Sequence, residues 1–345
     1  MRGCYAPRVL RELADIAELV AWATARFGPV ELIAEHSWPH GESRVVSLTR
    51  AMDGGGVVAG SAVAGSAVAG GAVHTRSDSS VGGGVWRGAN GAVESAVESA
   101  VVGKAAQRER IVVKSVRQRV HFERECAGYE YAARVLGGHA PRLLAKDESR
   151  LLIALSHVCG ELAQLEHDRD PETHVQAARL LRRLHDGSPV VNDNGLGERM
   201  RASFERFAVR CGELVAVDEL RAVRGMIERI EGAPIPVVAC HGDFSPRNWL
   251  VGDDGVVRLI DFGRFQRDHW TMDLLLVSRR YWQTHPGLRD AFFTGYGRSI
   301  EDVDQDYVRA AIGRWAVGTI LWAREHDDAP FEELGREALA ALLRR

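Results

Sequence analysis

The sequence predicts an α+β protein in two lobes, with strands in the first half and helices in the second. At 345 residues the chain exceeds the size at which a single hydrophobic core usually stops growing. Short apolar runs with strand character concentrate before residue 157, whereas apolar residues at helical spacing dominate beyond it. We therefore expect a first lobe over residues 1–157 and a second over residues 158–345.

The elements of the first lobe follow from periodicity and stop signals. Apolar positions at helical spacing predict a helix over Val9–Phe27, ended by Gly28-Pro29. Two strand-like runs on either side of a turn-rich loop predict a hairpin with a wide loop. A further strand, helix and strand follow, and Ser156–Gly160 reads as the connector between the lobes. The expected strands cover residues 30–34, 44–50, 110–116 and 151–155. The expected helix covers residues 120–136 and is closed by Gly137-Gly138.

The second lobe reads as largely helical. Residues 174–185 place Val175, Ala178, Leu181 and Leu184 on one face of a helix, and the same spacing returns over residues 312–320.

Residues 54–103 form a segment of low complexity between the second and third expected strands. A Val-Ala-Gly-Ser-Ala pentad and an Ala-Val-Glu-Ser unit recur within it. We interpret it as a disordered insertion. A membrane-spanning helix over Val57–Val73 is the alternative, but Gly, Ala and Ser supply little transfer energy. Because closure entropy grows slowly with loop length, an insertion at a hairpin tip leaves the sheet intact.

Composition excludes several classes of function. A net charge of −3 argues against nucleic acid as the main partner, and we expect no membrane partner. The five cysteines include no Cys-x-x-Cys pair, which fits reduced thiols and a cytoplasmic protein. No signal peptide is expected, because charged residues interrupt the first apolar positions. Only three of the 44 cationic residues are lysine, so a lysine at a special position stands out.

Two carboxylates and an amide fall at the edges of short strands in the second lobe. The run Val237–Cys240 leads into a polar loop that holds Asp243 and Asn248, and an Asp-Gly turn precedes a run that ends at Asp261. This pattern predicts a hairpin that brings the three residues together. Phosphoryl transfer needs a carboxylate that orients and deprotonates the attacking hydroxyl, and a divalent metal that neutralises the phosphates. We predict Asp243 as the base, with Asn248 and Asp261 as ligands of Mg²⁺.

Lys114 lies in the third expected strand, from which an ammonium can reach the phosphates of a nucleotide. Glu125 on the next helix is its predicted partner, since a facing carboxylate would hold the flexible lysine in that direction. Glu123 is the competing choice, although it points elsewhere on the helix. A surface ion pair is the alternative interpretation of Lys114 with Glu125.

The motif His-Gly-Asp-x-x-x-x-Asn followed by Ile-Asp-Phe-Gly resembles the aminoglycoside phosphotransferase and choline kinase family, relatives of the protein kinases. The resemblance covers residues 30–52 and 109–345. It implies a protein-kinase-like fold, with an antiparallel sheet and one helix in the N-terminal lobe and a mainly helical C-terminal lobe. It also implies ATP or GTP at the connector, near Ser156 and Val158, and Mg²⁺ at Asn248 and Asp261. His241 and Asp273 are implied to support the catalytic loop.

The resemblance implies a small-molecule kinase that phosphorylates a hydroxyl of an antibiotic, such as an aminoglycoside, or of a metabolite. A protein kinase is one rival, but only Phe262–Met272 separate Asp261 from Asp273, too short a span for a peptide platform. A catalytically silent nucleotide-binding member of the same fold is another. Residues Gly41–Arg44 lack a Gly-x-Gly-x-x-Gly cradle, which is the main departure from a nucleotide-binding pattern.

Several charged residues are expected to be solvated rather than functional. Arg247 and Arg264 could contact a phosphate or a substrate anion, but arginine is abundant in this chain and a solvated face is the preferred interpretation. The acidic residues of 301–306 and 327–328 could attract a polycation, and helix-end solvation is again preferred. His157 and Cys240 are expected to pack rather than bind ligands.

Overall fold

A capping box sets the start of the first helix. The computed structural model of the chain describes residues 12–36, 43–51, 108–298 and 305–344. The Asp15 carboxylate accepts from the Glu18 amide, and the Glu18 carboxylate accepts from the Asp15 amide, both at 2.8 Å. Helix α1 therefore runs over Ile16–Phe27 and ends at Gly28, whose φ of 79° is open to glycine. The expected start at Val9 is wrong for residues 12–14, which are not helical, and Val9 itself lies outside the described residues.

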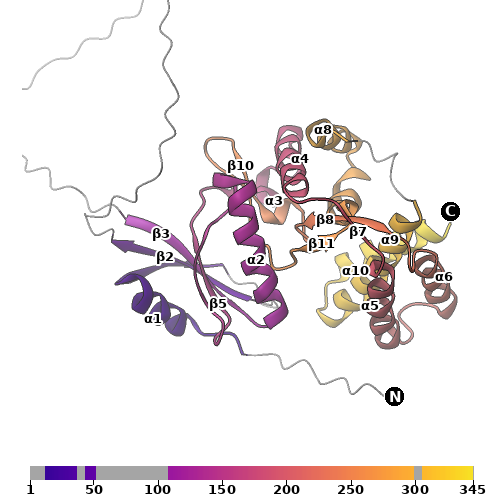
Figure 1. Cartoon of the computed structure of the whole chain (residues 1–345), viewed down its shortest axis with the longest axis horizontal. Coiled ribbons are helices and arrows are strands. Elements are labelled where there is room, and N and C mark those ends of the chain that lie inside the picture. The colour runs from indigo at the N-terminus through magenta and orange to yellow at the C-terminus, as the bar shows by residue number, and fades with distance from the viewer. Residues whose placement is uncertain (1–11, 37–42, 52–107, 299–304, 345) are drawn as a thin grey trace, which may run out of the picture. The chain divides into compact units, whose positions relative to one another are not determined.

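The N-terminal part of the chain forms a five-stranded sheet in the order β1-β2-β3-β5-β4 (Figure 1). The expected hairpin of β1 and β2 is antiparallel, as are the pairs β3 with β5 and β4 with β5. Four strands match expected runs, and β4 was not expected. Their bounds are β1 Val30–Glu35, β2 Ser43–Ala51, β3 Arg108–Val116, β4 Leu143–Asp147 and β5 Leu152–Ser156.

Alternation along β5 separates two layers of packing. Leu152 and Ala154 belong to the apolar cluster that includes Leu19 of α1, whereas Ile153 and Leu155 belong to the cluster that includes Phe122 of α2. Successive strand residues point to opposite faces, so α1 and α2 cover opposite faces of this sheet. Helix α2 spans Arg119–Val135 and is followed by the short helix η1 at Gly137–His139.

Beyond the connector the chain is largely helical, as expected. The expected helices over 174–185 and 312–320 are the cores of α4 and α9. The α-helices are α3 Ala163–Glu166, α4 Pro171–Asp186, α5 Leu196–Cys211, α6 Val217–Glu228, α7 Leu275–Val277, α8 Pro286–Tyr296, α9 Gln305–Glu325 and α10 Ala329–Leu343. Three other short helices are η2 Pro246–Asn248, η3 Trp270–Leu274 and η4 Ser278–Trp282.

Two small sheets hold the predicted catalytic segment. One has the order β10-β9-β6 and the other β11-β8-β7. Strands β9 and β10 form the expected hairpin, but β8 pairs with β7 and β11 instead, so the segment is shared between two sheets. The strands are β6 Glu161–Leu162, β7 Val191–Asp193, β8 Ile235–Cys240, β9 Trp249–Val251, β10 Val257–Leu259 and β11 Gln266–Asp268.

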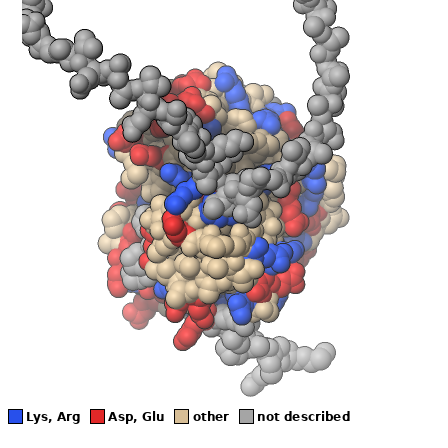
Figure 2. Space-filling model, turned by 90° about the vertical axis from the view of Figure 1, so that its left-hand side faces the viewer, with Lys and Arg blue, Asp and Glu red and all other residues tan. Residues whose placement is uncertain are grey.

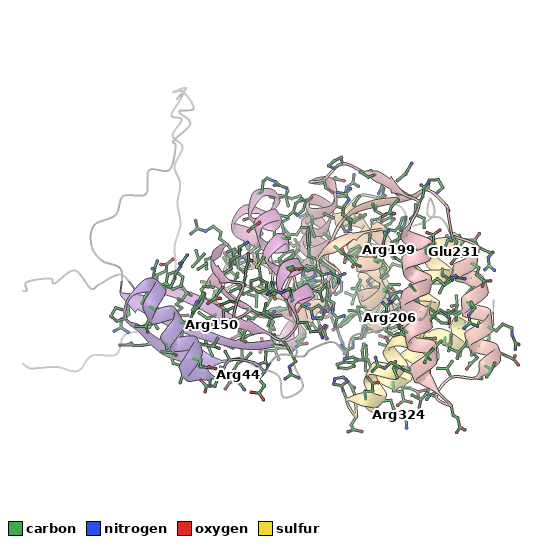
Figure 3. The ribbon with its side chains drawn as sticks, turned by 60° about the horizontal axis from the view of Figure 1, so that its bottom comes forward. Arg44, Arg150, Arg199, Arg206, Glu231 and Arg324 are labelled. Atoms are coloured by element: carbon green, nitrogen blue, oxygen red, sulfur yellow. The ribbon has the colours of Figure 1, made fainter. Side chains whose placement is uncertain are left out.

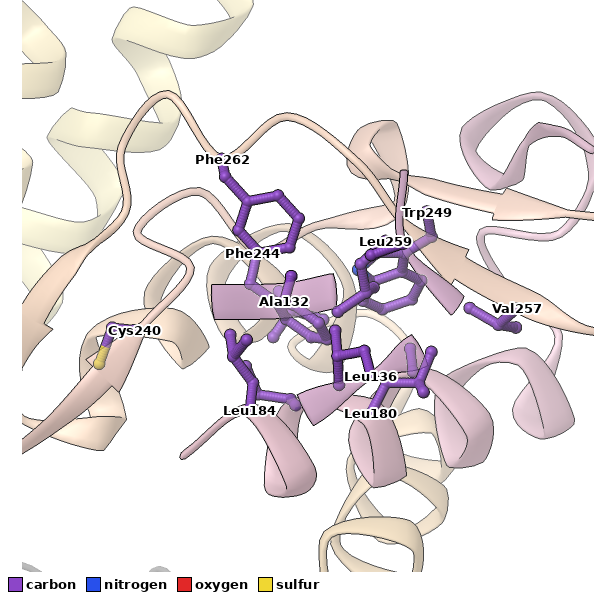
Figure 4. Packing of buried hydrophobic residues seen from close by; sticks show 14 of the residues in the cluster. Ala132, Leu136, Leu180, Leu184, Cys240, Phe244, Trp249, Val257, Leu259 and Phe262 are labelled. Carbon is purple, nitrogen blue, oxygen red and sulfur yellow. The ribbon is translucent and has the colours of Figure 1, made fainter. Parts of the chain in front are cut away.

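An apolar cluster lies against this segment. Figure 4 shows Phe244, Trp249 and Phe262 with Leu180 and Leu184 of α4. All five side chains are buried, and burial of each such residue is worth about 1.5–3 kcal/mol. The polar loop between β8 and β9 is therefore fixed by the apolar residues that flank its functional groups.

A second cluster holds α5, α6, α9 and α10 together, and Phe204 of α5 is fully buried in it. Charged residues lie on the outer faces of these helices, as Arg199, Arg206 and Arg324 show in Figure 3. Figure 2 looks onto the side of the molecule that holds the N-terminal sheet, where cationic and anionic side chains are interspersed around an uncharged area.

Cys126, Cys159, Cys211 and Cys240 are free thiols.

The segment 51–109 forms a separate unit from residues 1–50 and 110–345, which contain every predicted site residue. The predicted insertion at 54–103, with its alternative of a membrane helix, lies outside the described residues. Within the described ranges, no helix combines the length and the apolar character needed to cross a bilayer.

Candidate active site

The loop after β8 turns sharply at Gly242. Its φ is +81°, and a Cβ at this position would lie 2.1 Å from the carbonyl oxygen of Arg264. Only glycine meets both conditions, because other residues rarely adopt this φ and no side chain fits against that backbone. The glycine thus allows the segment after Asp261 to lie directly against the catalytic loop.

Asp273 of η3 binds the backbone of the same loop. Its Oδ2 accepts from the backbone N–H of His241 at 2.8 Å, and its Oδ1 accepts from that of Gly242 at 2.6 Å. His185, in the last turn of α4, also binds Oδ2 through Nε2 at 2.9 Å. The Asp273 side chain is fully buried, and hydrogen bonds to a buried carboxylate are strong. Through these bonds Asp273 holds the backbone of the loop in place at His241 and Gly242.

The buried trio of His185, Cys240 and Asp273 has the composition of a metal site but is otherwise engaged. His185 binds Asp273 with Nε2 and the Tyr296 hydroxyl with Nδ1, at 2.9 and 2.7 Å. The Cys240 thiol lies 3.4 Å from the Asp268 carbonyl oxygen, and burial raises its pKa well above the ordinary value. These contacts explain the trio as structural, and Cys240 packs in the core as expected.

His241 ties the catalytic loop to the strand that ends at Asp261. Its Nε2 bonds the Ile260 carbonyl oxygen at 3.0 Å, and its Nδ1 accepts from the Asp243 amide at 3.3 Å. This pattern assigns a neutral imidazole with the proton on Nε2. The backbone N–H of Ile260 in turn donates to the Asn248 carbonyl oxygen at 3.0 Å. The bonds made by Ile260 hold Asp261 beside Asp243 and Asn248.

Asn248 is buried and its side-chain orientation is fixed. Its Nδ2 donates to the backbone carbonyl of Asp243 at 2.8 Å, which leaves Oδ1 as the oxygen that can bind a cation. Asp261 is 44% exposed, and its Oδ1 accepts from Lys114 at 3.1 Å. An amide oxygen and a half-exposed carboxylate are the hard oxygen ligands that Mg²⁺ prefers, so these residues fit such an ion.

Lys114 of β3 bridges two carboxylates, one on α2 and one in the segment after β10. Its Nζ donates to Glu125 Oε1 at 2.7 Å and to Asp261 Oδ1 at 3.1 Å. Lys114 and Glu125 are 9% and 1% exposed, so the alternative of a surface ion pair is wrong. Glu123 is instead exposed and pairs weakly with Arg119 at 3.8 Å.

The ionisation of these groups is coupled. Burial alone would lower the pKa of Lys114, but the carboxylates of Asp261 and Glu125 raise it. Burial raises the pKa of Glu125 to about 7, against the opposing effect of Lys114. Partial desolvation of the Asp261 carboxylate would also raise its pKa, yet the Lys114 ammonium lowers it below its ordinary value. Asp261 is consequently a carboxylate at neutral pH, as a metal ligand must be.

Asp261 also adopts an unusual backbone conformation. Its φ is +63°, in the left-handed region that a non-glycine residue seldom occupies. The amide of Asp261 donates to the Tyr129 hydroxyl at 3.1 Å, and the Gly263 amide donates to Asp261 Oδ1 at 3.3 Å. These two bonds hold the residue in place, and such strain commonly occurs at functional sites.

Ser156 and Val158 lie at the connector, as the sequence indicates. Ser156 ends β5, and its hydroxyl accepts from the backbone amide of Arg142 at 2.9 Å. Val158 follows outside any helix or strand and is half-buried. Of the segment Gly41–Arg44, which lacks a glycine-rich cradle, only Ser43 and Arg44 are described, both at the start of β2.

Comparison with known proteins identifies the family. The family described as "Phosphotransferase enzyme family" matches residues 96–312, which is more than half of the chain. The chain belongs to this phosphotransferase family. The resemblance seen in its motifs is thus confirmed, whereas no curated protein matches the chain.

Solved structures confirm the fold of the phosphotransferase. A thermostable mutant of aminoglycoside phosphotransferase APH(4)-Ia, in complex with AMP-PNP and hygromycin B, matches with a TM-score of 0.58 and 13% identity, over 94% of this chain and 98% of the other. Macrolide 2'-phosphotransferase MphH from Brachybacterium faecium matches with a TM-score of 0.51 and 16% identity, over 94% and 97% of the two chains. The expected kinase-like fold, with its antiparallel sheet and helical C-terminal part, is correct.

Two residues of the phosphotransferase site were not anticipated from the sequence. His185 supports Asp273, but a histidine on the apolar face of a helix carries no pattern that distinguishes support from packing. Arg247 was expected to lie on a solvated face, and its side chain is indeed half exposed, but its Nη2 also binds Asp243 Oδ2 at 2.5 Å. Burial would lower the pKa of Arg247, and the carboxylates of Asp243 and Asp261 raise it instead. Its place four residues after Asp243 was the only available signal.

Proposed function

We propose that this phosphotransferase is a small-molecule kinase that moves the γ-phosphoryl group of ATP or GTP to a hydroxyl of its acceptor. The observation that carries this proposal is the grouping of Asp243 with Asn248, Asp261 and Lys114 in one compact unit. A base, two oxygen ligands for Mg²⁺ and a cation for the phosphates are the groups that phosphoryl transfer requires. Residues 1–157 would contribute the nucleotide side of the site and residues 158–345 the catalytic and acceptor side.

Each residue has a defined task in this reaction. Asp243 takes the proton of the acceptor hydroxyl. At the same time, the oxygen of that hydroxyl forms the new bond to the γ-phosphorus. The bond between that phosphorus and the β–γ bridging oxygen breaks, and its electron pair leaves with the nucleoside diphosphate. Lys114, held by Glu125, stabilises the negative charge of the nucleotide phosphates. Mg²⁺ at Asn248 and Asp261 would supply further charge neutralisation, and Ser156 and Val158 would contact the nucleotide base.

The segment after Asp261 favours a small acceptor over a protein. Strand β11 and helix η3 occupy residues 266–274, so Asp273 is reached with little chain to spare. A protein kinase carries a long activation segment at this place. Aminoglycoside and macrolide phosphotransferases share the fold, which supports an antibiotic or a metabolite with a free hydroxyl as the acceptor. We include a cytoplasmic location and a role in antibiotic resistance or metabolism in this proposal.

The test is transfer to a defined acceptor. Purified protein would be incubated with Mg²⁺, ATP or GTP, and a panel of aminoglycosides, macrolides, nucleosides, sugars and amino alcohols. A mass gain of one phosphoryl group on a panel member is the expected result. Asp243→Asn should lower the rate about 100- to 10,000-fold, because it removes the general base but keeps the shape of the side chain. Equal rates for the two proteins, or nucleotide binding without transfer to any panel member, would contradict the proposal.

A further inference from the structure

The two oxygens of the Asp243 carboxylate have different surroundings. Oδ2 accepts from Arg247 Nη2 at 2.5 Å. No hydrogen bond joins Oδ1 to another described residue, and the side chain is 12% exposed. One oxygen is therefore held by the protein, while the other is available to a hydroxyl.

The backbone around Arg247 is fixed on both sides. Pro246 is buried at the start of η2 and restricts its own φ. On the other side, the Asn248 amide donates to the Ser245 carbonyl oxygen at 2.8 Å, and the Asn248 side chain binds the Asp243 carbonyl oxygen. The guanidinium thus extends from a short, well-anchored turn toward the carboxylate four residues earlier.

We infer that Arg247 is a positioning residue, which holds Asp243 through Oδ2 so that Oδ1 faces the acceptor hydroxyl. An aspartate side chain can rotate about its last torsion, and such a rotation would turn both oxygens away from the line of attack. A guanidinium suits the task because it is planar and always charged, and its donors have a fixed geometry. The inference rests on the proposed kinase activity for its catalytic meaning, but the contact itself is independent of that activity.

A surface ion pair is the competing explanation, and the chain offers a matched example. Arg199 of α5 binds Asp193 at the same distance of 2.5 Å and is 57% exposed, against 48% for Arg247. Exposed pairs of this kind contribute little to stability. The two pairs differ at the acid, since Asp193 is 28% exposed and lies outside the site. Charge also separates them, because Arg247 interacts with Asp261 as well as with Asp243.

A double-mutant cycle tests the inference. The variants are Arg247→Ala, Asp243→Asn, the double variant and the control Arg199→Ala, each measured for kcat and for the nucleotide KM. We expect Arg247→Ala to lower kcat about 10- to 100-fold with KM unchanged, as misplacement of a catalytic group does. The double variant should be no slower than Asp243→Asn, because Arg247 acts only through that carboxylate. Arg247→Lys should restore part of the rate, and Arg199→Ala should match the wild type.

Two results would overturn the inference. Full activity of Arg247→Ala would show that Arg247 has no role in the reaction. Losses in kcat that multiply in the double variant would show that Arg247 acts apart from Asp243. A crystal structure of Arg247→Ala decides the matter even if no acceptor on the panel is phosphorylated. The Asp243 carboxylate should turn away from its present position, and an unchanged carboxylate would refute the positioning role while leaving the proposed kinase activity untouched.

Discussion

The charged groups of the active site and those of the C-terminal helices are arranged in opposite ways. Lys114 and Glu125 are buried and hydrogen-bonded to each other. In the group of helices α5, α6, α9 and α10, an apolar cluster lies inside and the ion pairs lie on the surface, as between Arg210 and Glu325, which are 57% and 39% exposed. Figure 3 shows this outer face through Arg199, Arg206 and Arg324.

The two regions differ in what their charged groups contribute to the stability of the fold. Desolvation of a buried ion pair can exceed its Coulombic gain, so the pair of Lys114 and Glu125 is weak evidence for stability. Lys114 also donates to Asp261 Oδ1, which places the pair in the candidate site. The helices, in contrast, gain their stability from apolar burial, to which their surface pairs add little.

The largest expected effect comes from breaking the buried pair. Lys114→Met should lower kcat/KM about 100- to 1,000-fold, because it removes a preorganised charge from the phosphates. It should also lower the free energy of unfolding, since Glu125 remains buried without its cationic partner. Steady-state kinetics and urea unfolding measure the two effects separately.

The double variant Lys114→Met with Glu125→Gln sharpens the distinction. It replaces the pair by neutral side chains of similar size, so the free energy of unfolding should return to the wild-type value or exceed it. Activity should remain as low as in Lys114→Met. Recovery of activity in the double variant would mean that Lys114 has no direct role at the phosphates.

An intermediate effect is expected where the helices meet the catalytic segment. The Tyr307 hydroxyl of α9 donates to Asp268 Oδ1 at 2.6 Å, and Asp268 lies in β11, the strand that pairs with β8. Both residues are buried, and burial raises the pKa of Asp268 although Tyr307 opposes this. Tyr307→Phe leaves a buried carboxylate with one donor fewer, which should lower the free energy of unfolding by about 1–3 kcal/mol.

Thermal unfolding is a suitable measurement for Tyr307→Phe, with Tyr281→Phe as the control. Tyr281 is half-buried, and no hydrogen bond connects its hydroxyl to another described residue. We expect the control to melt with the wild type. If Tyr307→Phe did the same, the bond to Asp268 would not join the helices to the catalytic strand.

The sequence predicts most of the fold because its signals are local. Alternating or continuous apolar runs marked β1, β2, β3 and β5, and helical spacing marked α2, α4 and α9. The strand β4 was missed, since Leu143–Asp147 contains a lysine and an aspartate and gains its place only by pairing with β5. The start of α1 was misplaced, although the Asp-x-x-Glu pattern at Asp15 was a legible capping box.

The candidate site divides along the same line. Its motif residues can be placed from the chain alone, because Asp243 and Asn248 are five positions apart and their spacing is set by one loop. The roles of Arg247 and His185 depend on which carboxylate each side chain meets after folding. Arg247 lies four residues after Asp243, and its bond to that carboxylate was not expected, because the abundance of arginine in this chain made a solvated residue the simpler interpretation. Pairing of β8 with β11, rather than with β9, likewise depends on contacts that the local pattern does not encode.

The smallest effect is expected at the surface of the helices, where Glu332 of α10 joins two arginines. It accepts from Arg324 of α9 at 2.7 and 2.8 Å and from Arg336 at 2.6 and 2.9 Å. Hydrogen bonds from Arg324 and then Arg336 lower the pKa of Glu332 from 4.5 to about 2. A lowered pKa in the folded state means that the stabilisation is present above pH 4.5 and is lost as pH falls toward 2. Glu332→Gln should therefore lower the free energy of unfolding by less than about 1 kcal/mol at pH 7, and its urea midpoint should approach that of the wild type as pH falls.

Glu333→Gln is the control, because it removes an exposed carboxylate from the same helix, and it should follow the wild type throughout. A loss in Glu332→Gln that stayed constant from pH 7 to pH 3 would show that shape, rather than charge, connects α9 to α10 at this point.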